Sequence, residues 1–213
     1  MKKELIYKIL KVVLIPTVLA FIKEIKGLEN VPKTPFVIAA NHASFIDPPV
    51  IKVIFQRHFK KKVFYLAKME LYSNPLKKLI IESSGTILVE RGKNDNNAVE
   101  SATDKVFEGE IVGLFPEGTR SPDGKLYRGK TGAVRIALAA KCPILPIGII
   151  NNYEFWPKHR KFPKLRRILA VKIGKPINIG EYSKKRLTKK LLDKLTDKVM
   201  REIASLTGQE YVN

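Results

Sequence analysis

Six apolar segments of β-type composition recur along this chain, and each is separated from the next by a stretch long enough to hold a helix. The expected strands are residues 36–40, 63–67, 86–90, 111–115, 144–150 and 168–174. The expected helices are residues 48–58, 72–83, 95–108, 131–141 and 184–206. Parallel strands require crossover connections of helix length, so the alternation predicts an α/β fold with a largely parallel or mixed central sheet flanked by helices.

The N-terminal residues have a different character. Residues 5–22 form an apolar run that approaches the hydrocarbon thickness of a bilayer, but Lys8 and Lys11 lie in its first half and Pro16 interrupts its middle. A lysine at the bilayer centre costs about 2.5–3.5 kcal/mol, whereas one near a helix end can extend to the headgroups. We therefore favour a helical segment inserted into one leaflet over a packed amphipathic helix, and both over a spanning helix. The expected organisation is a membrane-associating segment over residues 1–25 and one α/β domain over residues 26–213.

The charge of the chain is strongly positive, with 40 Lys and Arg against 20 Asp and Glu, a formal net charge of +20. Such a surface attracts anions, which include nucleic acid, anionic lipid headgroups and acidic carrier proteins. Residues 154–167 concentrate this charge and interleave it with Phe155, Trp156 and Phe162. Aromatic and basic side chains together suit a membrane interface, an anionic donor or nucleic acid, and a solvated basic loop has the same composition.

Polar side chains follow the expected strand 36–40, at the edge where ligands bind in open α/β sheets. A turn between His42 and Asp47 would let the carboxylate accept from one ring nitrogen and leave the other nitrogen free as a base. Pro48 suits the first helical turn, so Asp47 also fits the position that caps the following helix. For this pair alone, a capped turn is the simpler interpretation.

Two further strand ends carry groups suited to phosphate. Glu117, Gly118, Thr119 and Arg120 follow strand 111–115, so amides, a hydroxyl and a guanidinium converge there. Arg91 follows strand 86–90. Arginine is the side chain best suited to bidentate phosphate binding. Charged surface turns explain each cluster singly, but three such strand ends together indicate a site.

Four blocks of the sequence resemble a known family in their order and spacing. They are NHASFID (41–47), GTILVERG (85–92), FPEGTRS (115–121) and CPILPIGI (142–149). They are similar to the motifs of the glycerolipid acyltransferases, and most similar to those of bacterial 1-acyl-sn-glycerol-3-phosphate (lysophosphatidate) acyltransferases. The resemblance runs from about Gly27 to about Gly180.

The resemblance implies roles for individual residues. His42 would be the general base and Asp47 would orient it, while Pro146 would shape a substrate pocket and Lys68 would lie near the thioester carbonyl. The residues that would bind the glycerol phosphate of the acceptor are Arg91, Glu117, Gly118, Thr119 and Arg120.

The activity implied is transfer of a fatty acyl group from acyl carrier protein or coenzyme A to the sn-2 hydroxyl of 1-acylglycerol 3-phosphate, which gives phosphatidate for phospholipid biosynthesis. The expected partners are lysophosphatidate, the thioester donor and an anionic membrane surface, at the cytoplasmic face of the cell membrane. No metal or redox cofactor and no nucleic acid are expected. Neutral imidazole suits this proton transfer near neutral pH, and the single cysteine, Cys142, lies in an apolar stretch that suits an inert thiol.

Two alternatives remain open. Within the same class, the acceptor would be glycerol 3-phosphate or another lysophospholipid. In a different class, the chain would be a non-catalytic basic module that binds nucleic acid or anionic membrane, with His42 and Asp47 structural. Glu117 favours the enzyme, because a surface that binds polyanions gains nothing from a central carboxylate, whereas a glycerol hydroxyl needs an acceptor.

Overall fold

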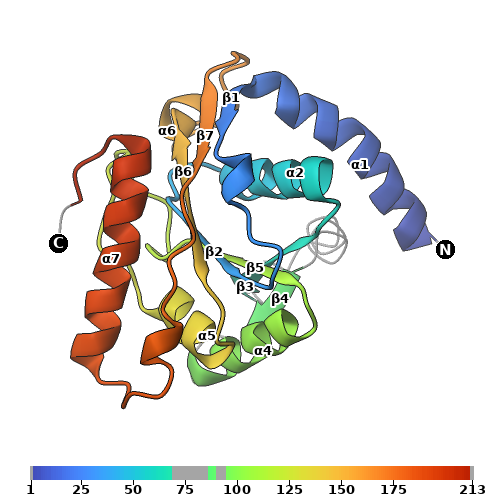
Figure 1. The fold of residues 1–213 in the computed structure, drawn as a ribbon. Coiled ribbons are helices and arrows are strands. Elements are labelled where there is room, and N and C mark those ends of the chain that lie inside the picture. The colour runs from blue at the N-terminus through green and yellow to red at the C-terminus, as the bar shows by residue number, and fades with distance from the viewer. Residues whose placement is uncertain (1, 69–85, 90–94, 212–213) are drawn as a thin grey trace.

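The fold is seen in a computed structural model, which describes residues 2–68, 86–89 and 95–211 (Figure 1). The described strands are β1 (Ile22–Lys26), β2 (Val37–Ala40), β3 (Val63–Lys68), β4 (Thr86–Val89), β5 (Ile111–Leu114), β6 (Ile144–Ile150) and β7 (Leu169–Ile173). The described α-helices are α1 (Lys2–Phe21), α2 (Asp47–Phe59), α4 (Asp95–Phe107), α5 (Gly132–Ala139), α6 (Asn152–Phe155) and α7 (Lys189–Thr207). Two short 3-10 helices, η1 and η3, cover Leu28–Asn30 and Gly180–Tyr182.

The strands of the described residues form one mixed sheet in the order β1-β7-β6-β2-β5-β3-β4. The pairs from β6 through β2, β5 and β3 to β4 are parallel, whereas β7 runs antiparallel to β6. All six expected strands are present within two residues of their expected bounds, and the mixed sheet flanked by helices is confirmed.

Strand β1 was not expected from the sequence. It pairs with β7 at the edge of the sheet, and its sequence IKEIK buries only Ile22 fully. Charged side chains are typical of edge strands because they discourage pairing with other chains. The expected boundary after residue 25 therefore falls inside a strand of the sheet.

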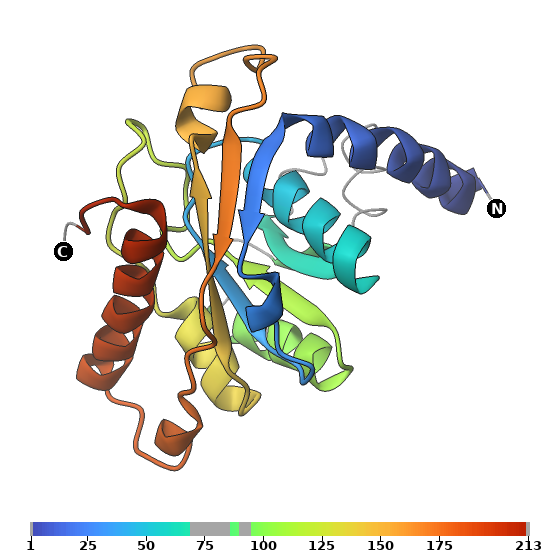
Figure 2. The same cartoon turned by 45° about the horizontal axis from the view of Figure 1, so that its top comes forward.

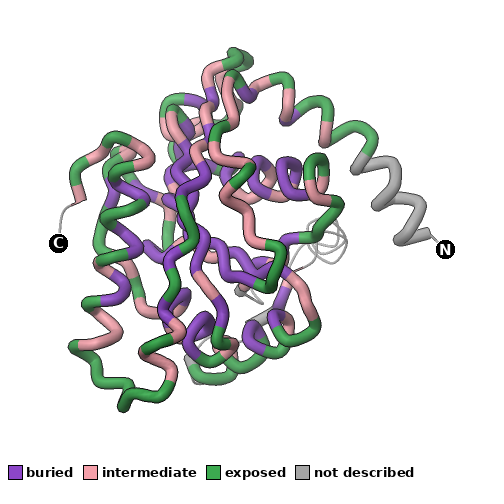
Figure 3. Tube along the Cα trace, viewed as in Figure 1, coloured by how far each residue is buried: buried purple, intermediate pink, exposed green. Residues whose placement is uncertain are grey.

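Helices cover both faces of the sheet (Figures 1 and 2). The side chains of β2 alternate between two cores: Ile38 and Ala40 pack in a cluster with α2, and Val37 and Ala39 pack in a cluster with α4, α5 and α7. All four are fully buried, as expected of a strand covered on both faces (Figure 3). Burial on both faces of the sheet explains why these strands are continuous apolar runs in the sequence.

The helices expected near 48–58, 95–108 and 131–141 correspond to α2, α4 and α5, and the helix expected over 72–83 lies outside the described residues. The last helix, α7, begins at Lys189, five residues later than expected. Thr188 has extended backbone dihedrals, and its side chain accepts a hydrogen bond from the Leu191 amide at 3.2 Å. This N-cap fixes the start of the helix.

Helix α1 contains Pro16 and packs on α2 through its C-terminal half. Val18 is buried in the first core, whereas Val12 and Val13 are exposed. Among the described residues, no helix is long and apolar enough to cross a membrane. The membrane association of residues 1–25 stays a prediction.

Candidate active site

The site lies where β2 and β5 end. These strands are parallel neighbours, so the loop after Ala40 and the loop after Leu114 leave the same edge of the sheet. The Ser121 amide donates to the carbonyl of His42 at 2.7 Å, and the His42 amide donates to Oε2 of Glu117 at 2.6 Å. Two motifs about 75 residues apart in the sequence therefore form one unit.

His42 and Asp47 are in direct contact: Nδ1 of His42 lies 2.8 Å from Oδ2 of Asp47. The same oxygen accepts from the amides of Ala43 at 2.9 Å and Ser44 at 2.8 Å. The other oxygen, Oδ1, accepts from Nδ2 of Asn152 at 2.9 Å. An ionised carboxylate only accepts, so in the neutral imidazole Nδ1 donates to Asp47 and Nε2 keeps a free lone pair. This is the arrangement of a general base held by a carboxylate.

The side chain of Asp47 does not cap helix α2, although its position before Pro48 suits that role. The helix begins at Asp47, the N-cap position is taken by Ile46, and no side chain caps the helix. The carboxylate is fully buried, and its Oδ2 is occupied by the imidazole and by two amides of the loop before it. The interpretation of this stretch as a capped turn is therefore wrong, and the stretch is a turn built around the His42–Asp47 contact.

Glu117 is also buried, and both of its oxygens accept hydrogen bonds from backbone amides. The amide of His42 contacts Oε2, and the amide of Tyr127 donates to Oε1 at 3.3 Å. Burial raises the pKa of Glu117 to about 7, against the lowering effect of these two hydrogen bonds. Glu117 thus fixes the backbone of His42, a contact that the sequence did not indicate. Its predicted contact with a substrate hydroxyl stays a prediction.

Arg120 is placed beside this turn. Its Cζ lies 3.5 Å from the centroid of the Phe45 ring, a cation–π geometry. Its Nη1 is buried and has no hydrogen-bond partner among the described residues. A buried, unpaired donor of a charged group is costly, so Nη1 of Arg120 lacks an acceptor that the described residues do not supply.

Of the other predicted binding residues, the structure describes some fully and others only in part or not at all. Thr119 and Gly118 are exposed on the loop between Glu117 and Arg120, and Gly118 has a positive φ of 71°. Lys68 is the last residue of β3, with its side chain outside the described part, and Arg91 lies wholly outside the described residues. Their predicted roles stay predictions.

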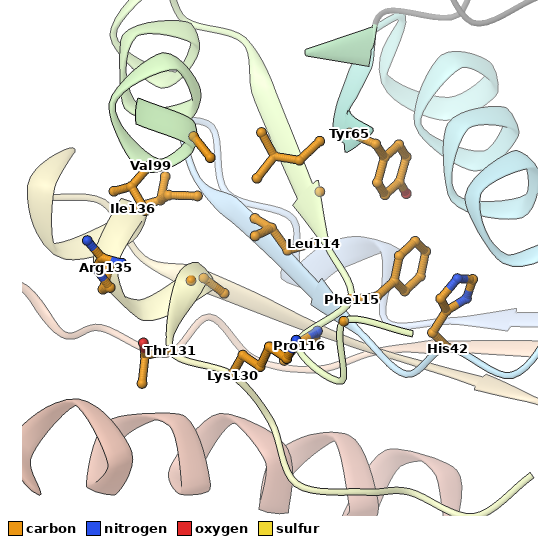
Figure 4. A pocket seen from close by; sticks show the side chains of 16 residues that line it. His42, Tyr65, Val99, Leu114, Phe115, Pro116, Lys130, Thr131, Arg135 and Ile136 are labelled. Carbon is orange, nitrogen blue, oxygen red and sulfur yellow. The ribbon is translucent and has the colours of Figure 1, made fainter. Parts of the chain in front are cut away.

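A cavity of about 350 Å³ opens beside His42 (Figure 4). The His42 ring stacks on Phe115, with centroids 4.1 Å apart, and Phe115 stacks on Tyr65 at 5.4 Å. From these rings the cavity extends past Leu114 toward α4 and α5. Its side chains there include Val99 and Ile136 among apolar groups and Lys130, Thr131 and Arg135 among polar ones. The imidazole therefore stands at one end of a largely apolar space. Pro146, inside β6, is not among the residues that line this cavity, and its predicted role in shaping a substrate pocket stays a prediction.

Three residues of the site were missed by sequence reasoning: Asn152, Phe115 and Tyr65. Asn152 follows β6 directly, so the rule that selected polar residues at strand ends would also have selected it. Phe115 and Tyr65 belong to apolar strand segments, and only the tertiary arrangement places their rings beside His42. Cys142, expected to be inert, is buried, and burial raises its pKa to about 11.

Comparisons with known proteins agree on one family. The sequence model of the family described as Acyltransferase matches residues 23–150. The chain is 33% identical over 183 residues to the 1-acyl-sn-glycerol-3-phosphate acyltransferase of Borreliella burgdorferi, which covers 82% of this chain and 70% of that protein. It is 29% identical over 158 residues to the chloroplastic 1-acyl-sn-glycerol-3-phosphate acyltransferase BAT2 of Brassica napus, over 72% of this chain and only 44% of that protein.

One solved structure is similar over nearly the whole chain. It is the crystal structure of the 1-acyl-sn-glycerophosphate acyltransferase PlsC from Thermotoga maritima, with a TM-score of 0.71 and 27% sequence identity. The match covers 99% of this chain and 84% of that one. The arrangement of sheet and helices is therefore shared with a solved enzyme structure.

Proposed function

The chain belongs to the Acyltransferase family, and we propose that it is a 1-acyl-sn-glycerol-3-phosphate O-acyltransferase that makes phosphatidate. The family predicted from the four sequence blocks is thereby confirmed. The observation that carries the proposed chemistry is the His42–Asp47 contact at the end of the cavity, which leaves Nε2 of His42 as a base.

In the proposed reaction, Nε2 of His42 removes the proton of the sn-2 hydroxyl as its oxygen attacks the thioester carbonyl carbon. The C–S bond then breaks, and the proton passes from the imidazolium to the leaving thiolate. Asp47 holds Nδ1 and stabilises the imidazolium that forms. General-base help of this kind contributes roughly 10²–10⁴-fold to the rate.

We assign the acceptor phosphate to the loop that carries Thr119 and Arg120. The unpaired Nη1 of Arg120 supports this assignment, because a phosphate oxygen would supply the missing acceptor. The cation–π contact with Phe45 helps to hold the guanidinium beside this loop. Arg91 and Lys68 are proposed to complete this site, as the resemblance implies.

We assign the fatty acyl chain to the cavity beside His42. Pockets of about 300–1,000 Å³ with mostly apolar walls are typical ligand sites, and this one begins at the proposed base. Both thioester donors, acyl carrier protein and coenzyme A, are acidic, and the net charge of +20 suits either of them.

The test is a matrix of acyl-transfer assays on the purified chain. Lysophosphatidate and glycerol 3-phosphate are each offered with acyl carrier protein and coenzyme A thioesters, in vesicles. We expect phosphatidate from lysophosphatidate with at least one donor. Product from glycerol 3-phosphate alone would change the acceptor, and a folded protein without product in any pairing would favour the non-catalytic basic module.

A further inference from the structure

Residues 156–167, which connect α6 to β7, form an exposed basic loop with apolar tips; we call it the docking loop. It holds six Lys and Arg and no Asp or Glu. Phe162 and Leu165 are 68% and 78% exposed, and among the residues whose side chains the structure describes, no other large apolar side chain is as exposed as Leu165. Two apolar side chains surrounded by cations are not explained by the core or by the active site.

The docking loop is held in a defined shape. Nε1 of Trp156 donates to the Arg160 carbonyl at 3.1 Å, and the amide of Lys164 donates to the Phe155 carbonyl at 2.8 Å. Nζ of Lys164 also lies 3.0 Å from Oε1 of Glu154. The exposed side chains of Phe162 and Leu165 are thus presented by an ordered scaffold.

The docking loop adjoins the junction between α1 and β1. Nε of Arg167 donates to the Ile22 carbonyl at 2.9 Å, and the rings of Phe21 and Phe155 lie 5.0 Å apart. The loop and this end of α1 lie at the same end of the molecule (Figures 1 and 2). Val12 and Val13, exposed on α1, are about 12–14 Å along the helix from Phe21, given a rise of about 1.5 Å per residue. Exposed apolar groups from two distant parts of the sequence therefore flank this junction.

The docking loop also adjoins the turn that carries His42. Oγ of Ser44 donates to the Trp156 carbonyl at 2.7 Å, and the rings of Phe45 and Trp156 lie 5.2 Å apart. Whatever the loop binds is therefore brought close to the candidate base. A lipid acceptor reaches an enzyme from a bilayer, so a lipid-binding loop at this place would shorten its path.

We propose that the docking loop inserts Phe162 and Leu165 into the headgroup and acyl boundary of an anionic bilayer while its basic side chains bind the headgroups. Apolar tips with a basic collar match the chemistry of an interfacial membrane contact. The aliphatic Leu165 gives nothing to the base stacking that single-stranded nucleic acid would use. The proposal concerns binding, so its main tests measure binding to vesicles.

The first test measures partition of the full chain into vesicles of phosphatidylcholine with and without phosphatidylglycerol. The variant Phe162→Ser/Leu165→Ser should weaken binding to the anionic vesicles by roughly tenfold, because two apolar side chains leave the bilayer. The matched control is Phe107→Ser/Leu187→Ser, which removes two exposed apolar side chains elsewhere. We expect the control to bind as the unmodified chain does.

A second pair of variants tests the charge. Replacing Lys158, Lys161 and Arg166 by Gln should weaken binding at low salt by about fivefold for each cation removed. The matched control replaces Lys190, Lys194 and Lys198 on the exposed face of α7 by Gln. We expect the control variant to lose much less of its binding to anionic vesicles. Equal losses in both triple variants would show that only the net charge matters and would overturn the proposal.

A fluorescence measurement locates the loop directly, because Trp156 is the only tryptophan of the chain. Nitroxide-labelled lipids with a shallow label should quench Trp156 in anionic vesicles, and the Phe162→Ser/Leu165→Ser variant should be quenched less. Unchanged partition and quenching in that variant would contradict the proposal. A raised KM for an acyl carrier protein thioester, with unchanged vesicle binding, would instead assign the loop to the carrier protein.

Discussion

The carboxylates of Asp47 and Glu117 form a network around His42 in which each carboxylate oxygen accepts at least one hydrogen bond. Asp47 accepts from His42, Ala43, Ser44 and Asn152, which offsets the cost of burying its charge. Glu117 holds the His42 amide from the other side. The position of the base is thus fixed through its ring and through its backbone, as a site held ready for reaction requires.

Asn152→Ala should weaken this network. Oδ1 of Asp47 would lose the one side-chain donor it has, and an unsatisfied buried polar group costs about 1–3 kcal/mol. We expect a loss of that size in the free energy of unfolding from urea titration, and a lower kcat with little change in the KM for either substrate. A kcat equal to that of the unmodified chain would show that Asn152 has no part in positioning the base.

Glu117 gives a prediction about pH. Burial raises its pKa from 4.5 to about 7, so the folded state holds this proton more tightly than the unfolded state does. The stability contributed by that proton is present below about 4.5 and is lost as pH rises to about 7, a difference on the order of 3 kcal/mol. In Glu117→Gln this dependence is absent. The free energies of unfolding of the two proteins, measured by urea titration across this pH range, should therefore converge or cross. Parallel pH dependences would contradict the burial of an ionisable Glu117.

The secondary-structure elements differ in how far the sequence predicted them. Strands buried on both faces, such as β2 and β6, are continuous apolar runs and were located within a residue. The edge strand β1 was missed because its charged residues give no such run. The polar residues at the ends of β2 and β5 do lie together, since parallel neighbours end at the same edge of the sheet. The contacts of Glu117 with His42 and of Asn152 with Asp47 join residues 75 and 105 positions apart, and no local pattern encodes them.

Helix α4 supplies the side of the cavity that lies away from His42, and Val99 is one of its lining residues. Val99→Phe should fill that space and shift the acyl preference toward shorter chains. A difference of one methylene in an apolar pocket is worth roughly tenfold or more in kcat/KM. The measurement is kcat/KM for a series of acyl donors, with the exposed Leu187→Phe as the control. Unchanged kcat/KM values across the acyl donors would show that the acyl chain lies elsewhere.

For the molecule as a whole, the N-terminal helix and the α/β sheet are not separable at residue 25. Val18 is buried in the first core and Ile22 pairs with Leu169 of β7. Removal of residues 1–25 would therefore remove part of the sheet. The expected membrane role must be tested by a shorter truncation.

Deleting residues 2–11 should lower vesicle binding while leaving the core packing of α1 in place. The residues that pack on the first core, from Ile15 onward, are retained. We expect weaker partition into anionic vesicles and a Tm close to that of the full chain. Full binding that resists high salt after this deletion would place the main anchor elsewhere in the molecule.

If His42 is the base of an acyl transfer, its removal should nearly abolish turnover and leave folding and lipid binding intact. Phosphatidate formation from lysophosphatidate is measured for the unmodified chain, for His42→Ala and for His58→Ala, whose imidazole is exposed on α2. Circular dichroism and vesicle partition establish that all three are folded and bind lipid alike. We expect a loss of about 10²–10⁴-fold in kcat for His42→Ala and none for His58→Ala. Turnover by His42→Ala at the rate of the unmodified chain would contradict this role of His42.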